Sequence, residues 1–205
     1  MFMVMLLFDI GNVVVECEHA ITYRRLQAYG ARKDAVRFFF DDDSLDFARG
    51  KLSPERFYSR LDPRINVTFD QAKEAFQKHL YGVNLEVVDI LERLRETLPR
   101  EDLGFLTDCN VWQVERVEGP QGLIRLDYYS DIVFRSCQIG MIKDDESLFP
   151  YVAQQVRRSP SDILLIDDNP ENNRMAERHG WQTLLYRYPE QLSRDLKQRG
   201  ILKEE

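Results

Sequence analysis

Short runs of consecutive apolar residues recur along the chain, and turn-forming or acidic residues follow most of them. Runs of this length and continuity are typical of strands in a parallel sheet that is covered on both faces. We therefore predict five strands, at Met3–Phe8, Leu103–Leu106, Asp131–Phe134, Ile163–Ile166 and Thr183–Tyr186.

Amphipathic stretches with helical spacing lie between these runs. In Glu86–Thr97 the apolar residues fall on one stripe, and Leu148–Val156 and Asn172–His179 have the same pattern. Strands and helices that alternate over this length predict an α/β fold, a Rossmann-like doubly wound parallel sheet with helices on both faces.

The alternation stops after the first strand. Between about Glu16 and Asn84 the sequence has helical patterns and no convincing strand. Four helices are expected there, at His19–Tyr29, Lys33–Phe40, Pro54–Leu61 and Phe69–Leu80. We predict a core domain from residues 1–15 and 85–205, and an inserted all-helical cap from residues 16–84. A block inserted at this point would lie over the carboxyl ends of the strands, where open α/β sheets bind ligands.

The aromatic and histidine residues of the insertion have ordinary explanations. Burial in the cap's own small core is expected for four phenylalanines, in preference to a surface that binds a protein partner: Phe38, Phe39, Phe40 and Phe47. The three histidines, His19, His79 and His179, fit no catalytic triad or metal spacing and are expected at the surface or an interface. His19 also lies near the junction of cap and core and for that reason stays a minor candidate for a functional role.

Charge and cysteine content narrow the classes of partner and compartment. The net charge of −7 argues against nucleic acid or an anionic membrane as the main partner, because both attract basic surfaces. Three scattered cysteines form neither a disulfide framework nor a zinc pattern and suit a cytoplasmic protein. The apolar start, Met1–Phe8, lacks a basic leader and a cleavage site and is too short to span a bilayer, so we interpret it as a buried strand.

Residues suited to phosphate chemistry stand at the ends of four predicted strands. Asp9 ends the first, Thr107 the second, Lys143 follows the third, and the pair Asp167–Asp168 ends the fourth. Each alone is ordinary, as a strand-end turn, a helix cap or a solvated lysine. Parallel strands end at one edge of a sheet, however, so these side chains should converge in one crevice.

The converging charges predict a metal. Carboxylates brought together repel one another unless a cation neutralises them. Mg²⁺ binds to one or two carboxylates together with phosphate and water, and a lysine can hold a phosphate and balance the anionic site.

In this order along the chain, the residues resemble the motifs of the haloacid dehalogenase superfamily of phosphatases and phosphotransferases. The similarity covers roughly residues 1–15 and 85–188, with the insertion where that family places its first type of cap. Response-regulator receivers use similar residues, but with the acidic pair first and the lysine last. The resemblance implies an aspartyl-phosphate formed on Asp9. It implies phosphate binding by Thr107, Asp108 and Lys143, and Mg²⁺ binding by Asp9, the carbonyl of Gly11, Asp167 and Asp168, with Asp168 the more direct ligand of the pair.

One position departs from the family's pattern. Most of its phosphatases have a second Asp two residues after the nucleophile, as general acid and base, and this chain has Gly11 there. Such assistance contributes ~10²–10⁴-fold to a rate. The substrate could have a good leaving group, another carboxylate such as Glu16 or Glu18 could enter from the cap junction, or the site could bind without turnover. The sequences of residues 8–15 and 49–57 resemble those of one branch of the superfamily, which includes bacterial glucose 1-phosphate phosphatases. Members of that branch also have Gly at the position of Gly11.

We therefore expect a Mg²⁺-dependent phosphatase that acts on a small phosphorylated metabolite such as a sugar phosphate. The alternatives are a catalytically weak member that binds phosphate or a protein partner, and a metal-independent haloacid dehalogenase, which the acidic pair disfavours. Gly11 disfavours a phosphomutase. Asp144 replaces a proline that many relatives have after the lysine. The sequence carries no signal for an oligomeric state.

Overall fold

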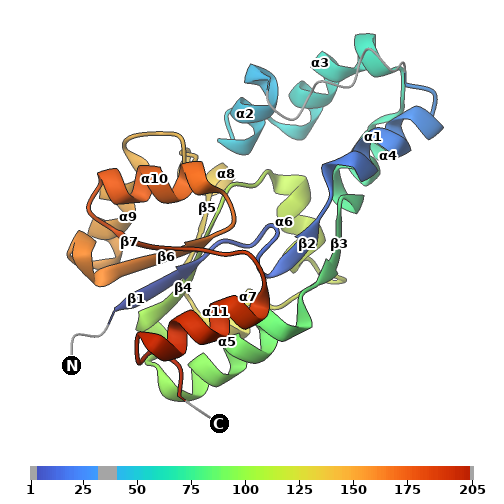
Figure 1. Ribbon diagram of the computed structural model, residues 1–205. Coiled ribbons are helices and arrows are strands. Elements are labelled where there is room, and N and C mark those ends of the chain that lie inside the picture. Colours follow the sequence, from blue (N-terminus) through green and yellow to red (C-terminus); the bar gives the residue numbers. More distant parts are fainter. Residues whose placement is uncertain (1–3, 32–40, 204–205) are drawn as a thin grey trace.

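Five parallel strands form the central sheet, in the order β5–β4–β1–β6–β7 (Figure 1). The structure is a computed structural model, and it describes residues 4–31 and 41–203. The strands are β1 (Met5–Phe8), β4 (Leu103–Thr107), β5 (Val133–Arg135), β6 (Ile163–Asp167) and β7 (Gln182–Leu185). All five predicted strands are present, and the doubly wound α/β architecture is confirmed.

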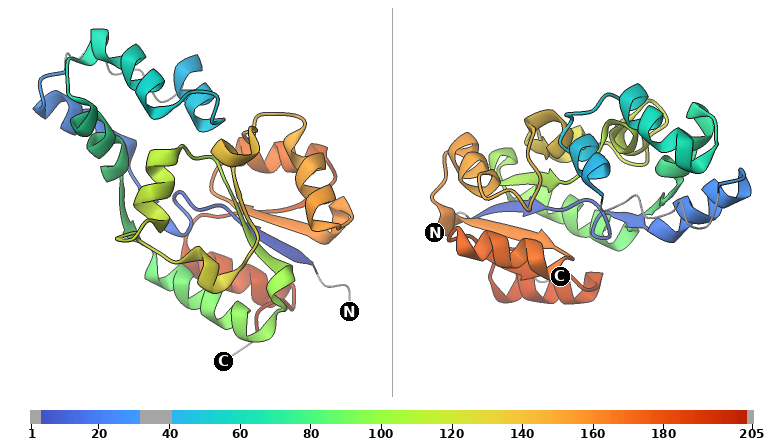
Figure 2. Two further views of the ribbon diagram at one scale, coloured as in Figure 1. Left: turned by 180° about the vertical axis from the view of Figure 1, so that it is seen from behind. Right: turned by 90° about the horizontal axis from the view of Figure 1, so that it is seen from above.

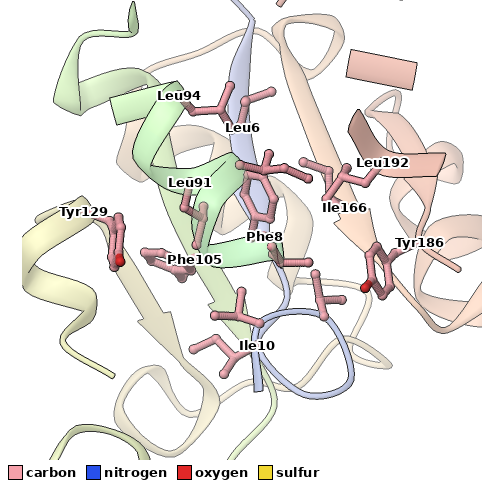
Figure 3. Close-up of a cluster of buried hydrophobic side chains, with 14 of the residues drawn as sticks. Leu6, Phe8, Ile10, Leu91, Leu94, Phe105, Tyr129, Ile166, Tyr186 and Leu192 are labelled. Carbon is pink, nitrogen blue, oxygen red and sulfur yellow. The ribbon is translucent and has the colours of Figure 1, made fainter. Parts of the chain in front are cut away.

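The central strand β1 is buried on both faces, which explains its unbroken apolar sequence. Leu6 and Phe8 belong to the cluster formed with α5 (Leu85–Thr97) and α11 (Pro189–Gln198) (Figure 3). Met5 and Leu7 point the other way, into the cluster formed with α9 (Leu148–Val156) and α10 (Pro170–Arg178). Successive side chains of a strand alternate between faces, so a strand covered by helices on both sides needs no polar position.

The remaining helices of the core follow β4 and β5. They are α6 (Val111–Glu118), α7 (Leu126–Tyr129) and α8 (Ser136–Ile139). Helix α6 was not predicted, although its start carries a capping box: the Asn110 side chain accepts from the backbone N–H of Gln113, whose own side chain accepts from Asn110 N–H.

The expectation that no strand lies between Glu16 and Asn84 is wrong. β2 (Val15–Cys17) and β3 (Leu80–Val83) pair as a two-stranded antiparallel sheet where the chain leaves and re-enters the core. Both strands are short, and their register shifts between Glu16 and Cys17, so neither has a regular alternation that a sequence pattern can reveal. Beyond them lie α1 (His19–Ala28), α2 (Asp42–Ala48), α3 (Pro54–Ile65) and α4 (Phe69–Lys78) (Figures 1 and 2). The expected helix at Lys33–Phe40 lies outside the described residues.

An aromatic cluster joins these helices to the core. Phe47 of α2 and Phe57 of α3 are stacked with ring centroids 4.3 Å apart, and Trp112 of α6 meets Phe47 edge-on at 5.0 Å. Burial of Phe47 is therefore confirmed, but this hydrophobic core does not belong to the insertion alone, because Trp112 comes from the segment after β4. Phe38, Phe39 and Phe40 lie outside the described residues. In the described part of the chain, no helix combines the length and apolar character needed to cross a bilayer.

Candidate active site

A crevice of about 580 Å³ opens at the carboxyl ends of β1, β4 and β6. The strand ends contribute Asp9, Thr107 and Asp168 to its wall, and Lys143 comes from the loop after α8. Helices α2 to α4 contribute apolar wall residues, among them Phe47, Phe57 and Phe76. The structure therefore brings together the four chain segments that the sequence predicts to converge.

The Lys143 ammonium group is the centre of this site. It is 1% exposed, and its Nζ donates to Asp9 Oδ1 at 2.7 Å and to Asp167 Oδ2 at 2.6 Å. Burial alone would lower the pKa of Lys143, but the charges of Asp167, Asp9 and Asp108 outweigh burial and raise it. The lysine is therefore charged at neutral pH.

The Asp167 carboxylate is held in place by several hydrogen bonds. Its carboxylate is fully buried and accepts from Asn172 Nδ2 at 3.0 and 3.1 Å and from the backbone N–H of Asn169 at 2.9 Å, besides Lys143. A buried carboxylate with this many hydrogen-bond donors around it is fixed in orientation. Asn172, one turn into α10, was not singled out from the sequence, because an asparagine in a helix has no distinctive pattern.

The surroundings of Asp9 act on the pKa of its carboxyl group in opposite directions. Burial raises its pKa to about 7, Lys143 opposes the shift, and the neighbouring carboxylates of Asp167 and Asp168 add to it. Its backbone N–H donates to Ile166 O at 2.8 Å, which continues the β1–β6 ladder up to the reactive side chain. The position of this carboxylate is therefore set by the sheet itself.

The carboxylates of Asp9, Asp167 and Asp168 offer oxygen atoms that lie within 4.8 Å of one another. Three carboxylates and one ammonium leave a net charge of −2 when all are ionised. Burial and the charge of Asp167 also raise the pKa of Asp168. A hard divalent cation would balance this charge and find its preferred oxygen ligands here, so the residues present fit Mg²⁺.

The phosphate side of the crevice is formed by Thr107, Asp108 and the Lys143 loop. Thr107 is buried at the end of β4, and the exposed Asp108 turns its carboxylate back to the Lys143 backbone N–H, with both oxygens 3.1 Å away. Asp108 thus orders the loop that carries Lys143. Asp144 lines the crevice as an exposed residue.

A second ion pair ties the inserted helices to the same loop. Arg49, just after α2, donates from Nε and Nη2 to the two oxygens of Asp145 at 3.0 and 2.7 Å. Asp145 Oδ2 also accepts the backbone N–H of Ile142 at 2.9 Å. Beside it, Ser136 Oγ donates to Ala48 O at 2.7 Å. A bidentate, partly buried pair of this kind is stronger and more directional than a surface ion pair.

Two residues singled out from the sequence lie elsewhere than expected. Glu16, the candidate substitute acid, is exposed and absent from the described residues that line the crevice; its Oε2 lies against Gly82, 2.3 Å from where a Cβ would stand. His79, expected at a surface or interface, is fully buried. His19 is exposed and lines the crevice, and His179 is half-buried beside Glu146.

The His79 ring is held as a neutral imidazole. Its Nδ1 lies 3.3 Å from Thr22 Oγ1, whose own hydrogen goes to Ala75 O, and its Nε2 lies 3.0 Å from Gln113 Nε2. The tautomer that satisfies all of these groups has its proton on Nδ1 and accepts from Gln113 at Nε2. Burial lowers the pKa of His79 to about 3, with a further contribution from His19.

We expect His79 to make the fold sensitive to acid. The unfolded chain binds a proton near pH 6.5 and the folded chain only near pH 3, so the free energy of unfolding falls as the pH drops from 6.5 toward 3. At pH 5 the cost is about 2 kcal/mol, at 1.36 kcal/mol per unit. Urea unfolding at pH 7.5 and 5.0 should therefore show a larger acid loss for wild type than for His79→Gln, with His179→Gln as control. Equal losses for wild type and His79→Gln would contradict this assignment.

Solved structures with a fold similar to that of this chain include HAD-like hydrolases. No protein-family model matches the sequence. A predicted HAD-like family hydrolase from Porphyromonas gingivalis has a TM-score of 0.79 and 27% identity, and the match covers 90% of this chain and 91% of that one. A HAD family enzyme from Bacteroides thetaiotaomicron, solved in complex with magnesium and inorganic phosphate, has a TM-score of 0.77 and 20% identity over 89% of this chain and 93% of the other.

Sequence comparison gives a similar picture. A D-ribitol-5-phosphate phosphatase from Bacteroides thetaiotaomicron is 22% identical over 186 residues, 87% of this chain and 89% of the relative. Two other curated relatives are much longer, and the chain spans 29% and 12% of their lengths. HAD abbreviates haloacid dehalogenase, the superfamily whose motif order the sequence resembles. Fold, strand-end residues and relatives agree, and we identify the chain as a member of the haloacid dehalogenase-like hydrolase superfamily.

Proposed function

We propose that this protein is a Mg²⁺-dependent phosphatase that hydrolyses a small phosphomonoester through an aspartyl-phosphate on Asp9. The observation that carries the proposal is the buried Lys143 ammonium bridging Asp9 and Asp167 on the floor of the crevice. A buried cation fixed between carboxylates is well placed to receive a phosphoryl group and to offset the charge that builds up on it.

The reaction would proceed in two displacements. An Asp9 carboxylate oxygen attacks phosphorus, the bond to the ester oxygen breaks, and the alcohol leaves with a proton. Water then attacks the same phosphorus, the bond to Asp9 breaks, and inorganic phosphate leaves with Asp9 restored. Lys143 and Thr107 would hold phosphoryl oxygens, and the loop orientation set by Asp108 would keep Lys143 in place. A carboxylate nucleophile divides one difficult step into two easier ones.

The metal would be held by Asp9, the carbonyl of Gly11, Asp167 and Asp168. When bound, Mg²⁺ supplies charge neutralisation for the phosphoryl group. Asp168 is the more accessible member of the acidic pair; its Oδ2 accepts from Asn12 Nδ2 at 3.1 Å, whereas Asp167 is enclosed by donors. We therefore assign direct ligation to Asp168, and to Asp167 mainly the orientation of Lys143.

The substrate would be a small ester held between the strand ends and the segment 16–84, which we propose acts as a cap. The similarity to a D-ribitol-5-phosphate phosphatase supports a sugar or polyol phosphate. The crevice wall that faces the strands includes apolar residues of the inserted helices, such as Phe47 and Leu45. Such a wall would exclude water from the reacting phosphate.

The first test is phosphate release from a panel of sugar phosphates, polyol phosphates and an activated aryl phosphate, with Mg²⁺ and with a chelator. We expect release that requires Mg²⁺ and saturates with substrate. Binding of phosphate or Mg²⁺ by calorimetry without turnover on any substrate would instead support the alternative of a binding protein, which the empty side-chain position at Gly11 favours. Release that is unaffected by the chelator would contradict the metal-dependent mechanism.

A further inference from the structure

The space above Asp9 on the Gly11 side is open. A Cβ added at Gly11 would meet only Asp9 Oδ2 within 4 Å, at 4.0 Å. A group that delivers a proton to the leaving alcohol must therefore come from another part of the crevice wall. General acids act within hydrogen-bond reach of the proton they transfer, directly or through one water.

The carboxylates nearest in sequence are turned elsewhere. Glu16 lies against Gly82, and Glu18 pairs with Arg24 at 2.8 Å; neither is among the described residues that line the crevice. Of the carboxylates that do line it, Glu118 is paired with Arg135, and Asp108 is turned to the Lys143 backbone. Asp144 also lines the crevice, but it belongs to the Lys143 loop and not to the cap junction. The titratable side chains that line the crevice at the cap junction are the imidazoles of His19 and His79 and the thiol of Cys17.

Those three groups differ in their ability to donate. Burial and the charges of Asp9 and Asp168 raise the pKa of Cys17 to about 12, so its thiol would be a very weak acid. His79 is buried, and its Nδ1 proton is used inside the protein. His19 remains exposed to solvent in the crevice. Partial burial lowers its pKa, and the charge of Asp168 opposes that shift.

The local fold places His19 in the wall of the crevice. β2 leaves the core just beyond the Asp9–Val15 turn, and His19 is the first residue of α1 after it. Its ring centroid lies 5.1 Å from that of His79, and the potential ligand atoms of Cys17, His19 and His79 lie within 4.8 Å of one another. The His79 ring, which contacts Thr22 of α1 and Gln113 of α6, thus lies beside His19.

We propose that His19 is the general acid and base of the reaction, in place of the carboxylate that Gly11 lacks. This inference rests on the proposed function. In the first displacement the imidazolium gives its proton to the ester oxygen as the phosphorus–oxygen bond breaks, which leaves neutral imidazole and a free alcohol. In the second, the imidazole takes a proton from the attacking water, which restores the imidazolium, and the bond from phosphorus to Asp9 breaks to release phosphate. Protons therefore balance over one turnover without another donor.

The test compares leaving groups in wild type and His19→Gln. An alkyl phosphate needs its leaving oxygen protonated, whereas an activated aryl phosphate does not. We expect kcat for the alkyl ester to fall by ~10²-fold or more in His19→Gln, with kcat for the aryl ester nearly unchanged. Free imidazole should restore part of the alkyl activity in His19→Ala, and the alkaline limb of the wild-type pH profile should disappear in both variants. Glu16→Gln is the matched control, because that exposed residue stands three positions away and outside the crevice lining.

The outcomes separate the two proposals. Equal losses for alkyl and aryl esters, or no loss for either, would overturn the role of His19 while the phosphatase proposal stands. A selective loss of alkyl activity in Glu16→Gln would transfer the role to Glu16. If wild type releases phosphate from no ester, the proposed function fails, and the role of His19 fails with it.

Discussion

Asp9→Asn is expected to reduce phosphate release to the uncatalysed background, by roughly 10⁴-fold or more, as removal of a nucleophile does in other enzymes. The amide has the shape of the carboxylate, but it is neutral and therefore a much weaker nucleophile toward phosphorus. Its neutrality also removes one of three crowded carboxylates, so we expect the variant to be at least as stable as wild type. Single-turnover phosphate release and thermal unfolding measure the two effects separately.

The matched control is Asp144→Asn. It makes the same chemical change at a carboxylate that also lines the crevice but is exposed and lies outside the three-carboxylate cluster. We expect it to retain most of the wild-type rate. An Asp9→Asn protein that keeps measurable Mg²⁺-dependent turnover would contradict the covalent mechanism. An Asp9→Asn protein that fails to fold would contradict our interpretation of the cluster as electrostatically crowded.

Lys143→Met is expected to produce the largest loss of stability among single substitutions in the site. The methionine fills a similar space, but it leaves buried carboxylates without their shared cation. Removal of one partner from a buried ion pair typically costs about 3–5 kcal/mol. The acidic residues would respond by taking up protons, so the loss should be larger at pH 8 than at pH 6. Denaturant unfolding at the two pH values, with and without Mg²⁺, measures these effects.

Mg²⁺ gives this prediction a second readout. If the metal and Lys143 share the work of neutralising the cluster, added Mg²⁺ should stabilise Lys143→Met more than it stabilises wild type. The control is Lys51→Met, whose lysine pairs with Asp46 at 3.4 Å on the surface and is expected to change stability by less than about 1 kcal/mol. A Lys143→Met protein as stable as wild type would show that the buried carboxylates are already protonated.

Three of the predicted strands are buried along their whole length. β1 and β6 are buried at every position, so their apolar runs identify them directly. The same argument locates Asp9 and Asp167 at the ends of those strands. In β2 and β3 this signal disappears, because the burial of neighbouring residues follows no period of two and the register slips.

Side-chain direction explains most of what the sequence could not predict at the site. Whether Glu16 or His19 faces the crevice depends on the register of β2 and on where α1 begins, and a change of one residue reverses the answer. The Arg49–Asp145 pair joins residues 96 positions apart, and charged residues at that separation carry no pairing signal in a single sequence. The burial of His79 likewise depends on Thr22 and Gln113, which come from two different helices.

The Arg49–Asp145 contact also has a consequence for the design of ligands. At that corner the end of α2 and the Lys143 loop are fastened to each other by paired charges and by the Ser136–Ala48 hydrogen bond. The segment 16–84 connects to the core through the short β2–β3 sheet, whose register is irregular. A synthetic inhibitor shaped for the end of α2 would therefore meet a surface that the Arg49–Asp145 and Ser136–Ala48 contacts hold in place beside the Lys143 loop.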